Sequence, residues 1–164
     1  MKTLYLVRHA KSGRDLDIRD FDRPLNERGY SDAHQIAIQV ASGNNQIDSI
    51  ISSPAVRTIT TALIFAGHLK YSTEKLILRH QLYDSELKDY LTVISQMTNT
   101  SSILLVGHNP TISELAQKLS IIRLNELKTS EVVALEFDIS SWKDIFNAVG
   151  KLIFQVKPAS VRED

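Results

Sequence analysis

Short apolar runs alternate with amphipathic stretches through residues 4–119, and this alternation restricts the possible folds more than any other feature of the sequence. Each of four apolar runs is bounded by polar or turn-forming residues: 4–7, 50–51, 76–78 and 103–106. Short uninterrupted runs of this kind are typical of strands that are buried on both faces in a parallel sheet. We therefore expect these four segments to form parallel strands.

The stretches between the runs repeat apolar residues at spacings of three, four and seven, which indicates helices with one buried face. The expected buried faces are Ala33, Ile36, Ala37 and Val40; Val56, Ile59, Leu63 and Ala66; Leu87, Tyr90, Leu91 and Ile94; and Ile112, Leu115, Ala116 and Leu119. Two helices are expected to begin at Ser53-Pro54 and Asn109-Pro110, because each pair combines a good N-cap with a proline suited to the first turn.

The pattern changes after Ser120, where two apolar segments, 132–137 and 152–156, are separated by a short turn at 142–146. We expect these segments to be strands that pair at one edge of the sheet, at least partly antiparallel. Alternation of strands and helices implies a sheet covered by helices. The predicted fold is therefore α/β, a three-layer αβα arrangement with a mostly parallel central sheet and an antiparallel edge, in which residues 1–164 form one domain.

Charge and cysteine content exclude several classes of protein. The 164 residues carry no formal net charge, which argues against a nucleic-acid partner, since duplex-binding proteins usually present a basic face. The absence of cysteine excludes a disulfide framework and a thiolate nucleophile. The first apolar run ends at Val7, too early for a signal-peptide core, and no segment has the length of a membrane span. We expect a cytoplasmic protein with no membrane partner.

Polar side chains follow three of the four parallel strands, where each strand ends. Arg8 and His9 follow the first strand, Ser52 and Ser53 follow the second with Arg57 in the next helix, and Gly107, His108 and Asn109 follow the fourth. Ligands of open α/β sheets bind beyond the carboxyl ends of the strands. Helix N-termini and arginine side chains both favour phosphate. The sequence thus predicts a phosphate site at this edge.

Histidine among arginines indicates a particular chemistry. Neighbouring positive charge disfavours the imidazolium form, so we expect a neutral ring near pH 7. A neutral imidazole can attack phosphorus and form a phosphohistidine, while arginines offset the charge on the transferring oxygens. The alternatives are that a single histidine at a strand end is a hydrogen-bonded structural group, or that His9 and His108 bind a metal. Adjacent arginines would repel a divalent cation, and no ligand spacing favours a metal site.

Several motifs resemble the histidine phosphatase superfamily, which has the phosphoglycerate mutase-like fold. The motifs are "LVRHAKS", "SSPAVRTITTA", "LLVGHNPTISELA" and "DFDRPLNERGY". "LYDSELKDYL" and "FQVKP" resemble its SixA-like branch, the phosphohistidine phosphatases. The resemblance implies a hydrolase in which His9 is the nucleophile that becomes phosphorylated. It also implies that Arg8, Arg57 and His108 hold the phosphoryl group, that Ser12 contacts it, and that no metal or other cofactor takes part.

The resemblance is weakest at the general acid. Larger members of the superfamily that act on sugar phosphates use a glutamate after the third strand, where this chain has "HQLYDSELKDY". Asp84 lies near the expected position but is one methylene shorter, and Glu86 is expected to open the next helix. An alkoxide leaving group needs a proton donor, whereas imidazole, with a reference pKa of about 6.5, departs with little help. A site without a firm acid therefore favours a P–N bond.

Three functions follow from these residues. The first is a phosphatase for protein phosphohistidine, acting on a histidine phosphotransfer domain or phosphocarrier and releasing phosphate. The second is a phosphatase for a small phosphate ester with Asp84 as the acid. The third is a phosphoprotein-binding module without turnover, which the intact arginines and histidines disfavour. The charged loop 12–24 is interpreted either as a solvated loop with internal ion pairs or as a rim over an open site that meets a protein substrate.

Overall fold

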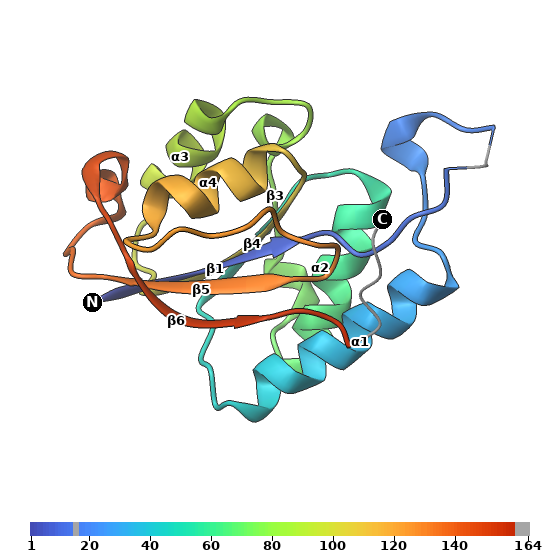
Figure 1. Cartoon of the computed structure of the whole chain (residues 1–164), viewed down its shortest axis with the longest axis horizontal. Coiled ribbons are helices and arrows are strands. Elements are labelled where there is room, and N and C mark those ends of the chain that lie inside the picture. Colours follow the sequence, from blue (N-terminus) through green and yellow to red (C-terminus); the bar gives the residue numbers. More distant parts are fainter. Residues whose placement is uncertain (15–16, 160–164) are drawn as a thin grey trace.

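A six-stranded mixed sheet forms the centre of the computed structural model, which describes residues 1–14 and 17–159 (Figure 1). The strand order is β3-β2-β4-β1-β5-β6. The strands are β1 (Lys2–Arg8), β2 (Ser49–Ser52), β3 (Ile77–Leu78), β4 (Ser102–Gly107), β5 (Val132–Phe137) and β6 (Lys151–Val156). Strands β1 to β4 pair in parallel, whereas β5 is antiparallel to both β1 and β6. The predicted parallel sheet with an antiparallel edge is confirmed.

Helices cover both faces of this sheet (Figure 1). Helices α1 (Glu27–Ser42) and α2 (Val56–His68) lie on one face, and α3 (Leu87–Ser95) and α4 (Thr111–Leu119) lie on the other. A 3-10 helix, Trp142–Asn147, joins α3 and α4 in covering their face. The sheet therefore separates two apolar cores, as the predicted three-layer architecture requires.

Alternate residues of the central strands supply the two cores. In β1, Leu4 and Leu6 pack with α3 and α4, while Tyr5 and Val7 pack with α1 and α2. All six residues of β4 are buried. Strands covered on both faces need continuous apolar sequence, which explains why residues 4–7 and 103–106 show no polar alternation. Full burial of one such leucine stabilises the fold by about 1.5–3 kcal/mol.

The buried face expected for α2 was wrong, because the helix is rotated about its axis relative to the expectation. The faces expected for α1, α3 and α4 are confirmed. Leu63 is 40% exposed, and the buried face of α2 instead carries Arg57, Thr61 and Phe65, spaced four residues apart. The Thr61 hydroxyl accepts a hydrogen bond from the Ala10 N–H at 3.0 Å. Docking against the segment after β1 therefore sets the rotation of α2, and that rotation turns Arg57 inward.

Both proline-containing helix starts were also placed too early. Helix α2 begins at Val56 with Ala55 at its N-cap, and α4 begins at Thr111 with Pro110 at its N-cap. The Ser53 hydroxyl lies 2.7 Å from the His108 Nε2 atom, so this buried side chain contacts a residue of the cavity described below rather than capping the helix. Glu86 does open α3, where it forms a capping box with Asp89, as expected.

Candidate active site

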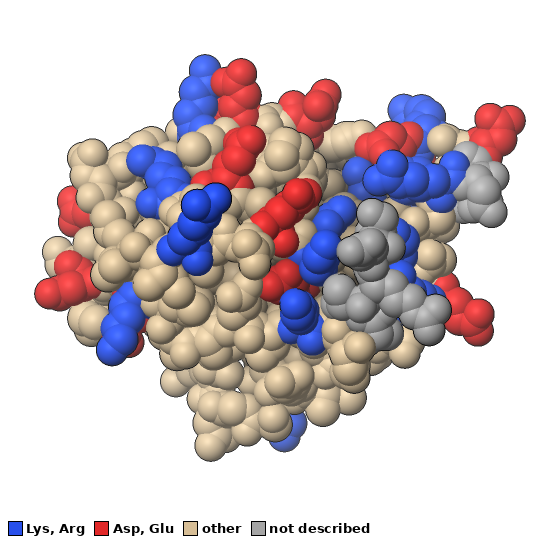
Figure 2. Space-filling model, viewed as in Figure 1, with Lys and Arg blue, Asp and Glu red and all other residues tan. Residues whose placement is uncertain are grey.

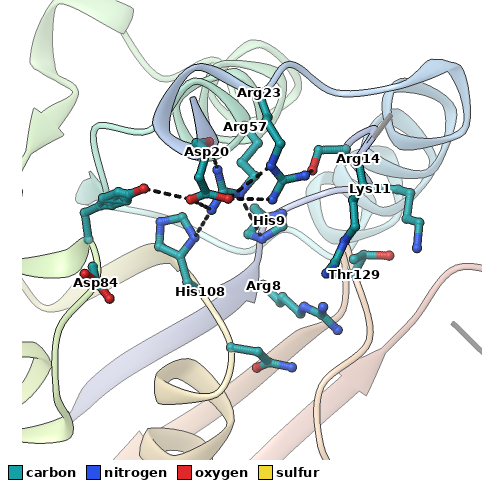
Figure 3. Close-up of a pocket in the computed structure, with 13 residues that line it drawn as sticks. Arg8, His9, Lys11, Arg14, Asp20, Arg23, Arg57, Asp84, His108 and Thr129 are labelled. Atoms are coloured by element: carbon teal, nitrogen blue, oxygen red, sulfur yellow. Dashed lines mark hydrogen bonds and ion pairs between the residues drawn. The ribbon is translucent and has the colours of Figure 1, made fainter. Parts of the chain in front are cut away.

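A cavity of about 490 Å³ lies beyond the carboxyl ends of β1, β2 and β4 (Figure 3). Its lining residues are Arg8, His9, Lys11, Ser12, Arg14, Asp20, Arg23, Arg57, Tyr83, Asp84, His108, Asn109 and Thr129. All six residues proposed from the sequence, Arg8, His9, Ser12, Arg57, Asp84 and His108, are among them. Five lining side chains are cationic and two are acidic, so the cavity favours an anion.

The hydrogen bonds of His9 fix its tautomer. The ring Nδ1 atom lies 2.8 Å from the Ala10 carbonyl oxygen, so Nδ1–H donates to that oxygen and Nε2 keeps its lone pair. Nε2 faces Arg57, whose Nε–H donates to it at 3.4 Å. Burial lowers the pKa of His9 well below its usual value, and the positive charges of Arg57 and Arg8 lower this pKa further. His9 is therefore a neutral ring with a nucleophilic nitrogen toward the cavity.

His108 is neutral for the same reasons. Burial lowers its pKa to about 4, and the charge of Arg57 is the next cause. Its Nδ1 atom accepts from Arg57 Nη2 at 3.4 Å, which leaves Nε2–H to donate to the Ser53 hydroxyl at 2.7 Å. The backbone N–H of His108 donates to the Tyr90 hydroxyl at 3.0 Å. From the sequence, only the neighbouring arginines were expected to lower the pKa of the histidines. Desolvation by burial is the larger cause for both His9 and His108.

Arg57 lies at the centre of the hydrogen-bond network although it is only 5% exposed. Besides both histidines, it binds Asp20, donating to the backbone oxygen at 2.7 Å and to the carboxylate at 3.0 Å. Arg23 and the Tyr83 hydroxyl also donate to the Asp20 carboxylate, at 3.0 and 2.7 Å. These three donors hold the pKa of Asp20 far below its usual value, against the opposing effect of desolvation. Asp20 is an anion and cannot supply a proton.

A turn between α4 and β5 holds the end of β1 in place. The Arg8 Nη1 atom donates to the Leu127 carbonyl oxygen at 2.9 Å. The Ser130 backbone N–H donates to the Arg8 oxygen at 3.1 Å and lies 3.3 Å from the His9 oxygen. Ser130 has a φ of 63°, in the left-handed region, so this tight approach requires an unusual backbone conformation. The turn therefore positions Arg8 and His9 from the side opposite Arg57.

The charged loop 12–24 contains internal ion pairs and also lines part of the cavity. It has the expected internal ion pairs, Arg19 with Asp22 and Arg23 with Asp20. The same Asp20 and Arg23 also line the cavity, and Arg23 Nη1 donates to the Ser12 hydroxyl. Residues 15 and 16 of this loop lie outside the described residues. The expected ion pairs are therefore confirmed, whereas contact of this loop with a protein substrate stays a prediction.

Six residues that line the cavity were not predicted from the sequence, namely Lys11, Arg14, Asp20, Arg23, Tyr83 and Thr129. Arg23 belongs to the quoted "DFDRPLNERGY" motif, so the resemblance contained a signal for it. Asp20 opens the same motif and Tyr83 belongs to the quoted "LYDSELKDYL", whereas Thr129 comes from a loop without a distinctive pattern. Asp84 lies at the edge of the cavity, beyond His108 as seen from His9, and no marked hydrogen bond or ion pair joins it to the residues drawn (Figure 3).

Residues 4–90 match the histidine phosphatase superfamily (branch 1). The chain belongs to this superfamily. An uncharacterized chloroplastic protein of Arabidopsis thaliana is 30% identical to the chain, and the match covers 91% of this chain and 72% of that protein. An uncharacterized protein of Mycobacterium tuberculosis is 29% identical over 82% of both chains. Membership in the superfamily makes the chain a phosphatase, which releases phosphate from a phosphorylated substrate.

Solved structures place this histidine phosphatase in the SixA-like branch. A candidate phosphohistidine phosphatase SixA from Agrobacterium tumefaciens is 28% identical, with a TM-score of 0.81 over 96% of this chain and 98% of that chain. A protein histidine phosphatase SixA bound to tungstate shares the fold, with a TM-score of 0.82 and 18% identity over 98% of this chain and 99% of the other. The phosphoglycerate mutase-like fold expected from the motifs is confirmed.

Residues 1–14 and 17–159 contain neither a cluster of metal-binding side chains nor a helix that could span a membrane. No three His, Cys, Asp or Glu side chains in this part of the chain are grouped so that they could hold a metal ion. None of its helices has the length and hydrophobicity needed to span a membrane.

Proposed function

We propose that this histidine phosphatase removes the phosphoryl group from phosphohistidine in proteins, through an intermediate on His9. The observation that carries the proposal is the hydrogen bond from His9 Nδ1–H to the Ala10 oxygen, because it leaves Nε2 unprotonated within a cationic cavity, where its lone pair can attack once the long contact from Arg57 is released. The likeness to the Agrobacterium protein, which is described as a phosphohistidine phosphatase, supports the choice of substrate.

The first step transfers the phosphoryl group from the substrate imidazole to His9. The Nε2 lone pair forms a bond to phosphorus while the P–N bond of the substrate breaks. The electron pair of that bond leaves on the substrate imidazole, which departs neutral when its other nitrogen already carries a proton. Arg8 and Arg57 offset the charge on the transferring oxygens, and His108 can donate to them when its Nε2–H turns from the Ser53 hydroxyl to the phosphoryl group. Ser12 is a further contact to the phosphoryl group.

The second step hydrolyses phosphorylated His9. A water molecule attacks phosphorus, the bond to Nε2 breaks, and its electron pair returns to the ring, so that His9 is neutral again and phosphate leaves. The water protons pass to the phosphate and to solvent. Because the leaving group in both steps is an imidazole, neither step needs a strong general acid. The ionised state of Asp20 and the peripheral place of Asp84 suit this chemistry.

The test compares a purified histidine-phosphorylated carrier domain with a panel of alkyl phosphates, in buffer containing EDTA. We expect fast phosphate release from the carrier and little from the esters. His9→Ala should abolish turnover and the phosphorylated intermediate seen by mass spectrometry, with circular dichroism unchanged. His80→Ala is the matched control, because His80 is exposed and does not line the cavity. Normal turnover by His9→Ala would refute the proposal.

A small phosphate ester is the second candidate substrate, because Asp84 does line the cavity. If Asp84 is the general acid, Asp84→Asn should slow hydrolysis of alkyl phosphates far more than hydrolysis of aryl phosphates, whose leaving groups need less protonation. Glu86→Gln is the control, since Glu86 caps α3 and does not line the cavity. Equal losses on both ester types would exclude Asp84 as the acid.

A further inference from the structure

A second cavity, of about 470 Å³, adjoins the first on one side of His9. Its lining residues are Arg8, Lys11, Arg14, Glu126, Leu127 and Lys128, and the first three also line the catalytic cavity. Figure 3 shows Lys11 and Arg14 on the Thr129 side of His9, away from His108 and Asp84. A substrate with its phosphoryl group at His9 could therefore extend toward Lys128 without passing Asp84.

The second cavity has an excess of positive charge. Four of its lining side chains are cationic, and its one acidic side chain, Glu126, accepts a hydrogen bond from the Asn109 amide at 3.1 Å. The chain as a whole has no net charge, so this excess is local. Figure 2 shows several Lys and Arg side chains close together at the right of the view, with Asp and Glu side chains beside them, whereas the lower part of the same face is almost free of charge. A cavity with this lining favours a negatively charged group.

The backbone that carries Lys128 is held firmly. Its N–H donates to the Glu131 carboxylate at 2.6 Å, and the preceding carbonyl, of Leu127, accepts from Arg8. Glu131 is only 3% exposed, and its other carboxylate oxygen accepts from the Gln155 amide at 2.7 Å. The Glu131 carboxylate is therefore engaged by these two donors, and Lys128 is among the residues that line the cavity. A lysine on a fixed backbone loses less entropy when it binds an anion than one on a mobile loop.

We propose that this second cavity binds a second anionic group of the substrate, a carboxylate or phosphate close to the scissile phosphoryl group. The inference rests on the proposed function and deepens it. In a protein substrate the group is an Asp or Glu side chain within a few residues of the phosphohistidine. Lysine suits this role because its ammonium group accepts anions from many directions, whereas the arginines nearer His9 match the planar array of phosphoryl oxygens. The cavity is too small, and its positive charge too confined, to bind a nucleic-acid backbone.

The experiment uses two phosphohistidine peptides that differ only in having Glu or Gln on both sides of the phosphohistidine. We expect the wild-type enzyme to hydrolyse the Glu peptide with kcat/KM about fivefold higher, the upper range for a partly exposed ion pair. Lys128→Gln should remove this preference and leave kcat/KM for the Gln peptide unchanged. Lys143→Gln is the control, because Lys143 is exposed on the 3-10 helix Trp142–Asn147 and should keep the preference.

Each outcome bears on a different claim. Turnover of both peptides at equal rates by the wild-type enzyme would overturn the second anion site and leave the proposed function intact. No turnover of either peptide would refute the proposed function. A second arm compares alkyl phosphates with and without a terminal carboxylate. A preference for the carboxylated ester that disappears in Lys128→Gln, without peptide turnover, would support the second site and show that it serves a small substrate.

Discussion

Acidification should destabilise this protein through His108. The pKa of His108 in the folded chain is about 4, below the reference value of about 6.5 that applies to the unfolded chain. At pH 5 the unfolded chain therefore binds a proton at this residue and the folded chain does not. Since the state that binds more protons gains stability as the pH falls, the free energy of unfolding decreases from about pH 6.5 down to about pH 4.

The size of the effect follows from the two pKa values. Where the unfolded chain binds a proton and the folded chain does not, the free energy of unfolding falls by about 1.4 kcal/mol per pH unit. Between pH 7 and pH 5, about one and a half units of the interval lie below the unfolded-state pKa, so His108 should contribute a loss of ~2 kcal/mol. The lowered pKa of His9 acts in the same direction. A loss of ~2 kcal/mol changes the unfolding equilibrium constant by roughly thirtyfold. It is a large part of the free energy of unfolding of a folded domain, which is typically about 5–15 kcal/mol.

Urea unfolding at pH 7 and pH 5 would measure the effect in the wild type, in His108→Gln and in His80→Gln. Gln at position 108 can still donate to the Ser53 hydroxyl but does not titrate, so this variant should lose about 2 kcal/mol less between the two pH values than the wild type does. His80→Gln should behave as the wild type, because His80 is exposed and outside the cavity. Equal losses in His108→Gln and the wild type would refute the reasoning.

Two further predictions concern the hydrogen-bond network of the site. Tyr90→Phe removes the buried acceptor of the His108 backbone N–H, so unfolding measurements should show a loss of about 1–3 kcal/mol, together with lower kcat; unchanged stability and kcat would contradict this. Asp20→Asn removes the carboxylate that competes with phosphate for Arg57, so inorganic phosphate should inhibit about two- to fivefold more tightly. The control is Asp22→Asn, in the same turn, and equal inhibition constants in all three proteins would contradict the second prediction.

The sheet and most of the helices could be predicted because local sequence determines them. Residues 103–106 are apolar on both faces, and a strand with this pattern needs cover on both sides. Helix α2 shows where this reasoning fails. Its sequence offers Leu63 for one apolar face and Phe65 for another, and periodicity cannot choose between them. The choice depends on the contact between Thr61 and Ala10, which joins residues 51 positions apart.

The same distinction applies to the cavity. His9 and His108 follow buried strands, so the topology of the sheet was enough to bring them together. Asp20 belongs to the quoted "DFDRPLNERGY" motif and Thr129 to a loop, but the contact of Asp20 with Arg57 and the position of Thr129 depend on tertiary structure that no local pattern encodes. The individual ion pairs of the charged loop could not be predicted. Its composition does not show which carboxylate binds Arg57 and which pairs with a neighbouring arginine.

The pairing of Arg57 with Asp20 reconciles two opposing demands on the site. A buried guanidinium without a counterion is strongly destabilising, and the side chain of Arg57 is almost fully buried. A buried carboxylate fixed beside it would stabilise the charge but would repel the phosphoryl dianion. The Asp20 side chain is 55% exposed and belongs to a surface turn, so it can neutralise Arg57 from outside and leave into solvent. Since Arg57 donates to Asp20 and to both histidines, an arriving phosphoryl group can take over the contacts of the carboxylate and of His9 Nε2, whose lone pair is then available for attack, while the contact with His108 persists.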